Sequence, residues 1–293
     1  MELDFGLYII NSDGTGMRPM TGEELLQRGL LFHLPFVPAE MVERAEEAGH
    51  FRRYYSALQL FHYEGIRWLP NGSAWIEPGE DGLYVVRADG TGSIRVAQGR
   101  VYNFDLSPDG GTIAYAEGTT IYSIEIDGSK RRELAGFQAR AVGDVYWSPK
   151  GDQILISTSR GPGAVCVDDL YLVNFDTQRI QSLFHLPRLR ESCLHNSQWS
   201  SDGQHVEFIL CDRENATTFF MSITKNGDDL QQIAQITGLG SCFERVAWSP
   251  DHTQFVFSLF LEEGLYILDP NNGHYWQILS GYVPGSPIWL PEP

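Results

Sequence analysis

Short apolar segments that run into polar turns recur along this chain. Six of them end at an anchor residue and are followed by turns rich in Ser, Pro, Asp or Gly. The anchors are Trp68, Leu106, Trp147, Trp199, Trp248 and Trp289. Strand-length runs of Ile, Val, Tyr and Phe broken by Gly, Asp and Asn are typical of β-strands and not of amphipathic helices. The pattern therefore predicts a chain built from short strands.

A second strand signal lies 16 to 24 residues after each of the first five anchors. It is an apolar run centred on an aromatic residue, and a sixth copy opens the chain; the centres are Tyr84, Tyr122, Tyr171, Phe220, Tyr266 and Tyr8. Most copies then meet a turn signal, and in three of them it contains an Asp-Gly pair: Asp13-Gly14, Asp89-Gly90 and Asp127-Gly128. Such pairs supply the positive φ of a tight hairpin, so each repeat is predicted to hold four strands.

The spacing of the anchors, 38, 41, 52, 49 and 41 residues, lies in or just beyond the range of propeller blades. We predict an all-β fold: a six-bladed β-propeller of four-stranded antiparallel blades in a single domain, residues 1–293. The blades are expected near residues 62–100, 101–140, 141–190, 191–240 and 241–281, with a closing blade of 282–293 plus 1–20 and an insertion at 21–61.

Four of the turns carry a specific motif. They are Leu106-Ser107-Pro108-Asp109-Gly110, Trp147-Ser148-Pro149-Lys150-Gly151, Trp199-Ser200-Ser201-Asp202-Gly203 and Trp248-Ser249-Pro250-Asp251. This motif resembles the WSPDG core of the TolB-type, WD40-like PD40 repeat family, whose propellers have six blades. The resemblance implies a fold more than a function, because similar blades occur in envelope scaffolds, peptidase propellers and pectate-fragment lyases.

The closing blade is predicted to draw on both chain ends. The segment at Trp289 supplies its innermost strand, whereas Leu7–Ile10 and Arg18–Met20 supply the outer two. Pairing the ends in this way removes open sheet edges. Either this blade has three strands or the natural chain continues past Pro293, and we favour the second alternative.

The charge balance limits the kinds of molecule that the protein is expected to bind. With 38 acidic and 21 basic residues the formal charge is -17, which repels phosphate backbones and anionic lipid headgroups. We expect no nucleic acid partner, and a monomer. No apolar run reaches the 18 residues that span a bilayer, and the acidic start Met1–Phe5 is unlike a signal peptide. The family resemblance implies a periplasmic or other extracytoplasmic location, but the sequence leaves the compartment open.

The insertion at 21–61 is far longer than a blade connection needs, and such segments are usually functional or disordered. A helix is predicted from Pro38 towards Tyr55, with one apolar face and one solvent-exposed face rich in Glu. It would plug or cover the propeller, or act as a lid that binds a partner. Its best contact patch is Arg52, Arg53 and Tyr54, which is basic and aromatic on an acidic protein.

Four cysteines form another unusual feature. Cys193 and Cys242 each stand six residues before an anchor, as does His62, and Cys166 and Cys211 lie in or near the connections between second and third strands. Free buried thiols, one or two disulfides, and a metal site with nearby histidines are all compatible with this spacing. No C-x-x-C or H-E-x-x-H pattern supports a metal, so we expect free or partly paired thiols and no cofactor.

A positive group is predicted at one connection. His185 stands in Phe184-His185-Leu186-Pro187, a repeat of Phe32-His33-Leu34-Pro35, and Arg188, Arg190 and His195 follow. A His among Phe, Leu and Pro is typical of packing at a blade end. If the protein binds an anionic sugar or a carboxylate, these residues and His62 are the candidates.

Two functions follow from these features. No nucleophile elbow or phosphate-binding loop is present, so we assign no catalytic residue and expect a non-enzymatic scaffold that recognises a protein or peptide. The alternative is a carbohydrate-active enzyme similar to the oligogalacturonate lyases, in which resemblance implies a metal that acidifies a sugar carbon and a base that removes the proton. An accessory or sensor domain of a larger protein is a third possibility.

Overall fold

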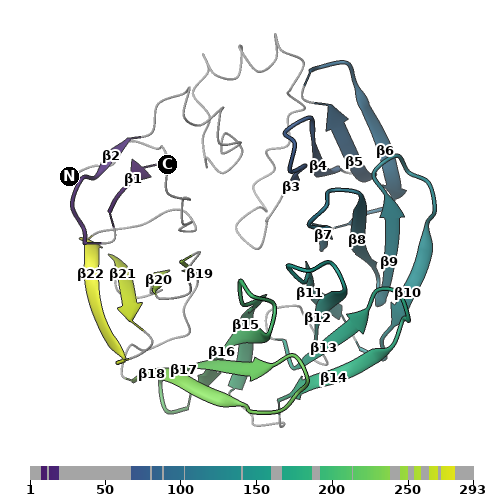
Figure 1. The fold of residues 1–293 in the computed structure, drawn as a ribbon. Helices are drawn as coiled ribbons and strands as arrows, with labels where there is room; N and C mark the ends of the chain where they lie inside the picture. Colours follow the sequence, from purple (N-terminus) through teal and green to yellow (C-terminus); the bar gives the residue numbers. More distant parts are fainter. Residues whose placement is uncertain are drawn as a thin grey trace. The chain divides into compact units, whose positions relative to one another are not determined.

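A computed structural model describes residues 8–11, 13–19, 67–79, 81–87, 89–101, 103–139, 141–159, 167–186, 192–212, 214–237, 245–249, 254–258, 264–269 and 272–280. These residues form an all-β structure of antiparallel sheets, and none of them lies in a helix (Figure 1). Accordingly, the described part of the chain contains no helix with the length and apolarity of a membrane span. The predicted helix between Pro38 and Tyr55 lies outside the described residues.

The chain divides into two compact units. The first contains Pro19–Gly136 and holds two four-stranded sheets. Sheet I consists of β3 (Arg67–Trp68), β4 (Ala74–Gly79), β5 (Gly82–Arg87) and β6 (Ser93–Gln98). Sheet II consists of β7 (Phe104–Leu106), β8 (Thr112–Glu117), β9 (Thr120–Glu125) and β10 (Arg132–Gly136).

The second unit joins Ile9–Arg18 to Phe137–Pro293. Sheet III consists of β11 (Ala141–Trp147), β12 (Gln153–Ser159), β13 (Asp169–Asn174) and β14 (Ile180–His185). Sheet IV consists of β15 (Ser192–Trp199), β16 (His205–Asp212), β17 (Thr217–Thr224) and β18 (Gln231–Thr237). Sheet V consists of β19 (Arg245–Trp248), β20 (Phe255–Ser258), β21 (Gly264–Asp269) and β22 (His274–Ser280). A short pair, β1 (Tyr8–Ile9) with β2 (Arg18–Pro19), spans the division.

Each four-stranded sheet is ordered as its strands occur in sequence, an antiparallel meander. The five anchors from Trp68 to Trp248 are the last residues of the first strands, and the aromatic centres from Tyr84 to Tyr266 lie on the third strands. This confirms the predicted four-stranded repeat for these sheets, which are consistent with propeller blades. Trp289 lies outside the described residues.

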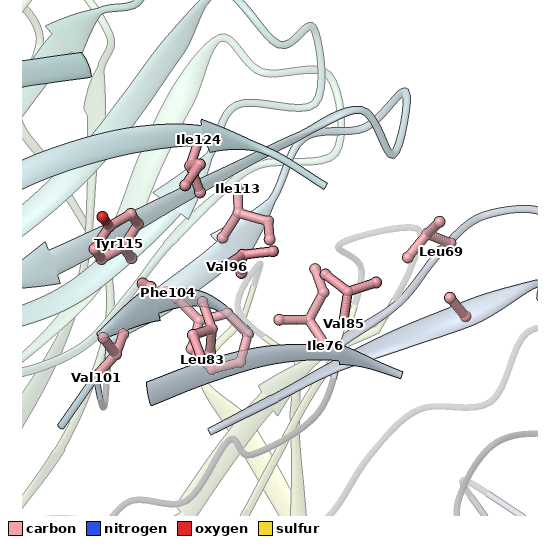
Figure 2. Close-up of a cluster of buried hydrophobic side chains, with 12 residues drawn as sticks. Leu69, Ile76, Leu83, Val85, Val96, Val101, Phe104, Ile113, Tyr115 and Ile124 are labelled. Atoms are coloured by element: carbon pink, nitrogen blue, oxygen red, sulfur yellow. The ribbon is translucent and has the colours of Figure 1, made fainter. Parts of the chain in front are cut away.

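Neighbouring sheets share apolar cores. In the first unit, Ile76, Leu83 and Val85 of sheet I pack with Phe104 and Ile113 of sheet II (Figure 2). In the second unit, one cluster joins sheets III and IV, with Phe184 and Phe208 rings 4.8 Å apart, and another joins sheets IV and V. Alternating strands of β-branched and aromatic residues therefore bury one sheet face against the next sheet.

The motif turns are built in one way. In sheet II the Ser107 hydroxyl donates to Asp109 Oδ1 (2.5 Å) and accepts from Thr112 N (2.9 Å), which closes the turn between β7 and β8. This hydrogen bond holds the pKa of Asp109 below its ordinary value. Ser200 and Asp202 repeat the arrangement. In the third repeat, where Lys150 replaces the motif Asp, the Ser148 hydroxyl donates to Asp152 instead (2.7 Å).

These turns also contact the next sheet of their own unit. Gly110 has φ +75, and a Cβ there would lie 2.6 Å from Cδ of Pro70, which is in the equivalent turn of sheet I. Between sheets III and IV the same approach joins Pro149 to Gly203 (3.3 Å). The Pro and Gly of these turns thus pack one sheet against the next, whereas the Ser and Asp form the hydrogen bonds that close the turn itself.

Replacing Gly110 by Ala should test this double role. The left-handed φ alone costs about 1–2 kcal/mol, and the clash with Pro70 should raise the loss in free energy of unfolding to about 3 kcal/mol. Gly118→Ala is the control, because Gly118 has φ +63 but no atom within 4 Å of its Cβ position. Urea unfolding of both variants measures the difference; equal losses would show that the Pro70 contact contributes nothing.

Candidate functional site

Only two of the predicted site residues lie in the described part of the chain, His185 and His195. The others, Arg52, Arg53, Tyr54, His62, Arg188 and Arg190, lie outside the described residues. The two described site residues belong to sheets III and IV.

His185 is oriented by a buried carboxylate. It is the last residue of β14 and lies opposite Asp169, the first residue of β13. Its Nδ1 forms an ion pair with Asp169 Oδ1 when the ring is protonated, and the exposed fractions of the two side chains are 58% and 4%. Leu186 N donates to Asp168 O (2.7 Å), which extends the pairing one residue beyond the strand. An exposed imidazole fixed by a buried carboxylate has the arrangement of a positioned base or ligand.

The two histidines occupy different parts of the second unit. His185 is on the outermost strand of sheet III, whereas His195 is on the first strand of sheet IV, partly buried and opposite Ile209. The sequence places these residues close together, but the fold assigns them to separate sheets.

A polar cluster that the sequence analysis missed joins the first strands of sheets III and IV. Asp144 Oδ2 accepts hydrogen bonds from the hydroxyls of Ser157 (3.0 Å) and Ser197 (2.9 Å), and Asp144 N donates to Ser157 Oγ (2.6 Å). Ser157 and Ser197 are fully buried, and Asp144 is partly buried. A carboxylate with two hydroxyl donors inside a protein is a strong electrostatic link.

Local backbone irregularities make the cluster possible. The register of β11 with β12 shifts between Val142 and Val145, and that of β15 with β16 shifts between His195 and Gln198. Such bulges re-aim side chains out of the regular alternation. Gly143 is required in the first bulge, since a Cβ there would lie 2.6 Å from Ser157 Oγ.

Two further contacts fasten these sheets together. Trp199 Nε1 donates to Tyr146 O (3.2 Å), which links the ends of β15 and β11. Val167 and Leu194 form an isolated antiparallel bridge. In the first unit, Arg67 on β3 pairs with Asp105 on β7 (3.1 Å), again between first strands of neighbouring sheets. Polar links between first strands are thus a recurring device of this fold.

The cysteine prediction is partly resolved. Cys193 and Cys211 are both disulfide-bonded, so they are not free thiols. Cys166 and Cys242 lie outside the described residues. Within the ranges that the structure covers, no three His, Cys, Asp or Glu side chains gather as ligands for one metal ion.

A sequence signal for the polar cluster exists in retrospect. Gly143-Asp144 lie four and three residues before the anchor Trp147, and Asn196-Ser197 lie three and two residues before Trp199. A glycine or a short polar pair inside a strand often indicates a bulge. The partner Ser157 has no such signal, because it is followed by two more small polar residues, Thr158 and Ser159, and nothing in the sequence sets it apart.

Ser197→Ala should destabilise the second unit. It removes one of the two hydroxyl donors to Asp144 Oδ2, at an expected cost of about 1–3 kcal/mol in the free energy of unfolding. Ser182→Ala is the control, since Ser182 is exposed on β14 and its loss should cost less than about 0.5 kcal/mol. Chemical denaturation measures both; a Ser197→Ala value as small as the control would mean that the cluster does not fasten the sheets.

Solved structures share this fold. An oligogalacturonate lyase in complex with manganese is similar with a TM-score of 0.61, at 12% identity over 74% of this chain and 64% of the lyase. A putative TolB from Agrobacterium tumefaciens is similar with a TM-score of 0.52, at 19% identity over 77% of this chain and 85% of the TolB chain. The hydrazine synthase of Kuenenia stuttgartiensis is similar with a TM-score of 0.56, at 16% identity over 71% of this chain and 64% of the synthase chain.

No protein-family model matches the chain. No curated protein sequence matches it either. The chain spans 64% of the length of the lyase that it resembles. The TolB and the lyase are both β-propellers, and at these identities the likeness concerns the fold alone, which supports a β-propeller fold for this chain.

Proposed function

We propose that this chain is a six-bladed β-propeller that serves as a non-enzymatic recognition module for a protein or peptide partner. The partner binds the insertion at residues 21–61 and the neighbouring connections. The sixth blade forms from the two chain ends. This closure is supported by the second unit, which groups Ile9–Arg18 with sheets III to V, and in which the Cβ position of Gly14 lies 3.3 Å from Ile278 O of β22.

The length of one connection carries the proposal. Successive four-stranded sheets are joined by four to seven residues, as between Gly136 and Ala141 or between Thr237 and Arg245. By contrast, 47 residues separate Pro19 of β2 from Arg67 of β3. The repeat does not need this segment, and long additions to a rigid scaffold commonly carry binding.

The described sheets supply the rigidity that such a scaffold requires. Neighbouring sheets are joined by apolar cores and by polar links such as Arg67–Asp105 and Asp144–Ser197. A platform of this kind holds its loops in place with little loss of entropy on binding. Arg52, Arg53 and Tyr54 form the proposed contact patch, since Arg and Tyr are enriched at interface hot spots. His62, Arg188, Arg190 and His195 belong to the neighbouring connections and strands.

Affinity capture from the source organism, with partners identified by mass spectrometry, tests the proposal. The intact chain should retain a partner protein, and replacing residues 21–61 by a short Gly-Ser linker should reduce its recovery at least about tenfold, the effect of losing about 1.4 kcal/mol of binding free energy. The Arg52→Glu, Arg53→Glu double variant keeps the insertion and should show a similar loss.

The matched control is the Arg87→Glu, Arg179→Glu double variant, which changes the net charge equally at two exposed positions of the described sheets. It should retain the partner. Undiminished capture by the linker variant would contradict the proposal, as would equal losses for the two double variants.

The His185–Asp169 pair favours a second function, a carbohydrate-active enzyme for acidic oligosaccharides. His185, held by Asp169, would act as the base that takes a proton from a sugar carbon, and Arg188 and Arg190 would bind the sugar carboxylates. The similar lyase is in complex with manganese. The described residues of this chain offer no ready metal site, so this proposal assigns no metal ligand.

Assays on acidic oligosaccharides with added manganese separate the two functions. If the chain is such an enzyme, unsaturated product should accumulate, and His185→Ala should lower the rate by about 100-fold or more, the usual contribution of a positioned base. His274→Ala, at an exposed position on β22, should leave the rate unchanged. An intact chain that forms no product would exclude this second function.

A further inference from the structure

Two disulfide-bonded cysteines of the second unit lie inside an apolar core. Cys193 on β15 and Cys211 on β16 lie opposite each other in the paired strands. Their exposed fractions are 3% and 2%, and both are disulfide-bonded. Of the four cysteines in the chain, these are the two that the structure describes.

Aromatic side chains from two sheets surround this position. The core that contains both cysteines also contains Phe220 of sheet IV and Phe255 and Phe257 of sheet V. The rings of Phe220 and Phe255 meet edge to face with centroids 4.6 Å apart. In the folded protein this packing shields the sulfurs of Cys193 and Cys211 from an enzyme or a soluble thiol, because thiol–disulfide exchange needs direct access to sulfur.

We infer that Cys193 and Cys211 are oxidised while the chain folds, and that the protein matures and works in an oxidising compartment. Each disulfide forms from two thiols, which lose two protons and two electrons. The electrons pass to the disulfide of a thiol-oxidising protein or a small-molecule disulfide, whose two sulfurs become thiols. This exchange must precede the packing of sheet V on sheet IV, since both sulfurs are buried afterwards.

The compartment follows from the same chemistry. Glutathione and thioredoxin keep thiols reduced in the cytosol, and disulfides persist in secreted, periplasmic or surface proteins. A disulfide sulfur in an aromatic core packs as an apolar group. If the chain folded in the reduced state, each disulfide would be replaced by two thiols whose sulfur atoms are not bonded and so lie farther apart. The oxidised cysteines therefore belong to the native core and do not act as a switch.

Thiol trapping tests the inference. Cells that produce the protein naturally are quenched in acid, and the precipitated protein is dissolved in neutral denaturant with N-ethylmaleimide. Cys193 and Cys211 are then read on separate peptides by mass spectrometry before and after reduction. We expect no adduct on either peptide before reduction and one adduct on each afterwards. An adduct on either peptide before reduction would overturn the inference.

A stability measurement gives a second test that requires no variant. The chain is unfolded in urea, reduced or left oxidised, and refolded with or without reductant. The melting temperature of the reduced sample should be about 5 °C or more below that of the oxidised one. The reason is that loss of native disulfides lowers the free energy of unfolding, and a lower free energy of unfolding lowers the melting temperature. The folded, oxidised protein should resist the same reductant when it is added without urea. Equal melting temperatures would contradict a structural role.

Discussion

The packing of each sheet on its neighbour is the constraint on which this structure depends. A four-stranded sheet in this chain has an apolar face that it cannot bury by itself, and the described clusters show how the next sheet covers it. Tyr115 and Ile113 of sheet II complete the core begun by Ile76 and Leu83 of sheet I. Because the interfaces within each unit are built alike, a short repeated motif can specify the packing of several sheets.

The polar groups support the same interfaces. Within the motif turn, Ser and Asp satisfy backbone amides while Pro and Gly meet the adjacent turn, as in Pro70 with Gly110. Farther along the first strands, Asp144 and Ser197 link sheets III and IV, and Arg67 and Asp105 link sheets I and II. Buried hydroxyls and carboxylates are stable there because each has a partner on the next sheet. The result is a platform from which a recognition segment can be presented.

The sequence predicts the repeat well because its signals are local. Trp147 and Tyr171 stand at fixed places in their strands, and Asp-Gly pairs such as Asp127-Gly128 form the expected turns with Gly128 at φ +82. The site is less predictable, because it depends on contacts between strands far apart in sequence. His185 and Asp169 meet through strand register, and Ser197 reaches Asp144 through two bulges that no periodicity displays. The proximity of Arg188 and Arg190 to His195 in sequence likewise says nothing about where a ligand would bind.

The proposed propeller closes through its N-terminal segment, which must then lie against sheet V. The distance between Thr15 and Gln277, both exposed and each close to the Gly14–Ile278 approach, measures this directly in solution. Nitroxide labels on a Thr15→Cys, Gln277→Cys variant, kept oxidised at its buried cysteines, can be read by double electron–electron resonance. We predict one narrow distribution centred below about 25 Å, as expected for flexible labels on neighbouring sheets that pack about 10 Å apart. A broad distribution extending well beyond that distance would show that the N-terminal segment does not join sheet V, and would contradict the closed propeller.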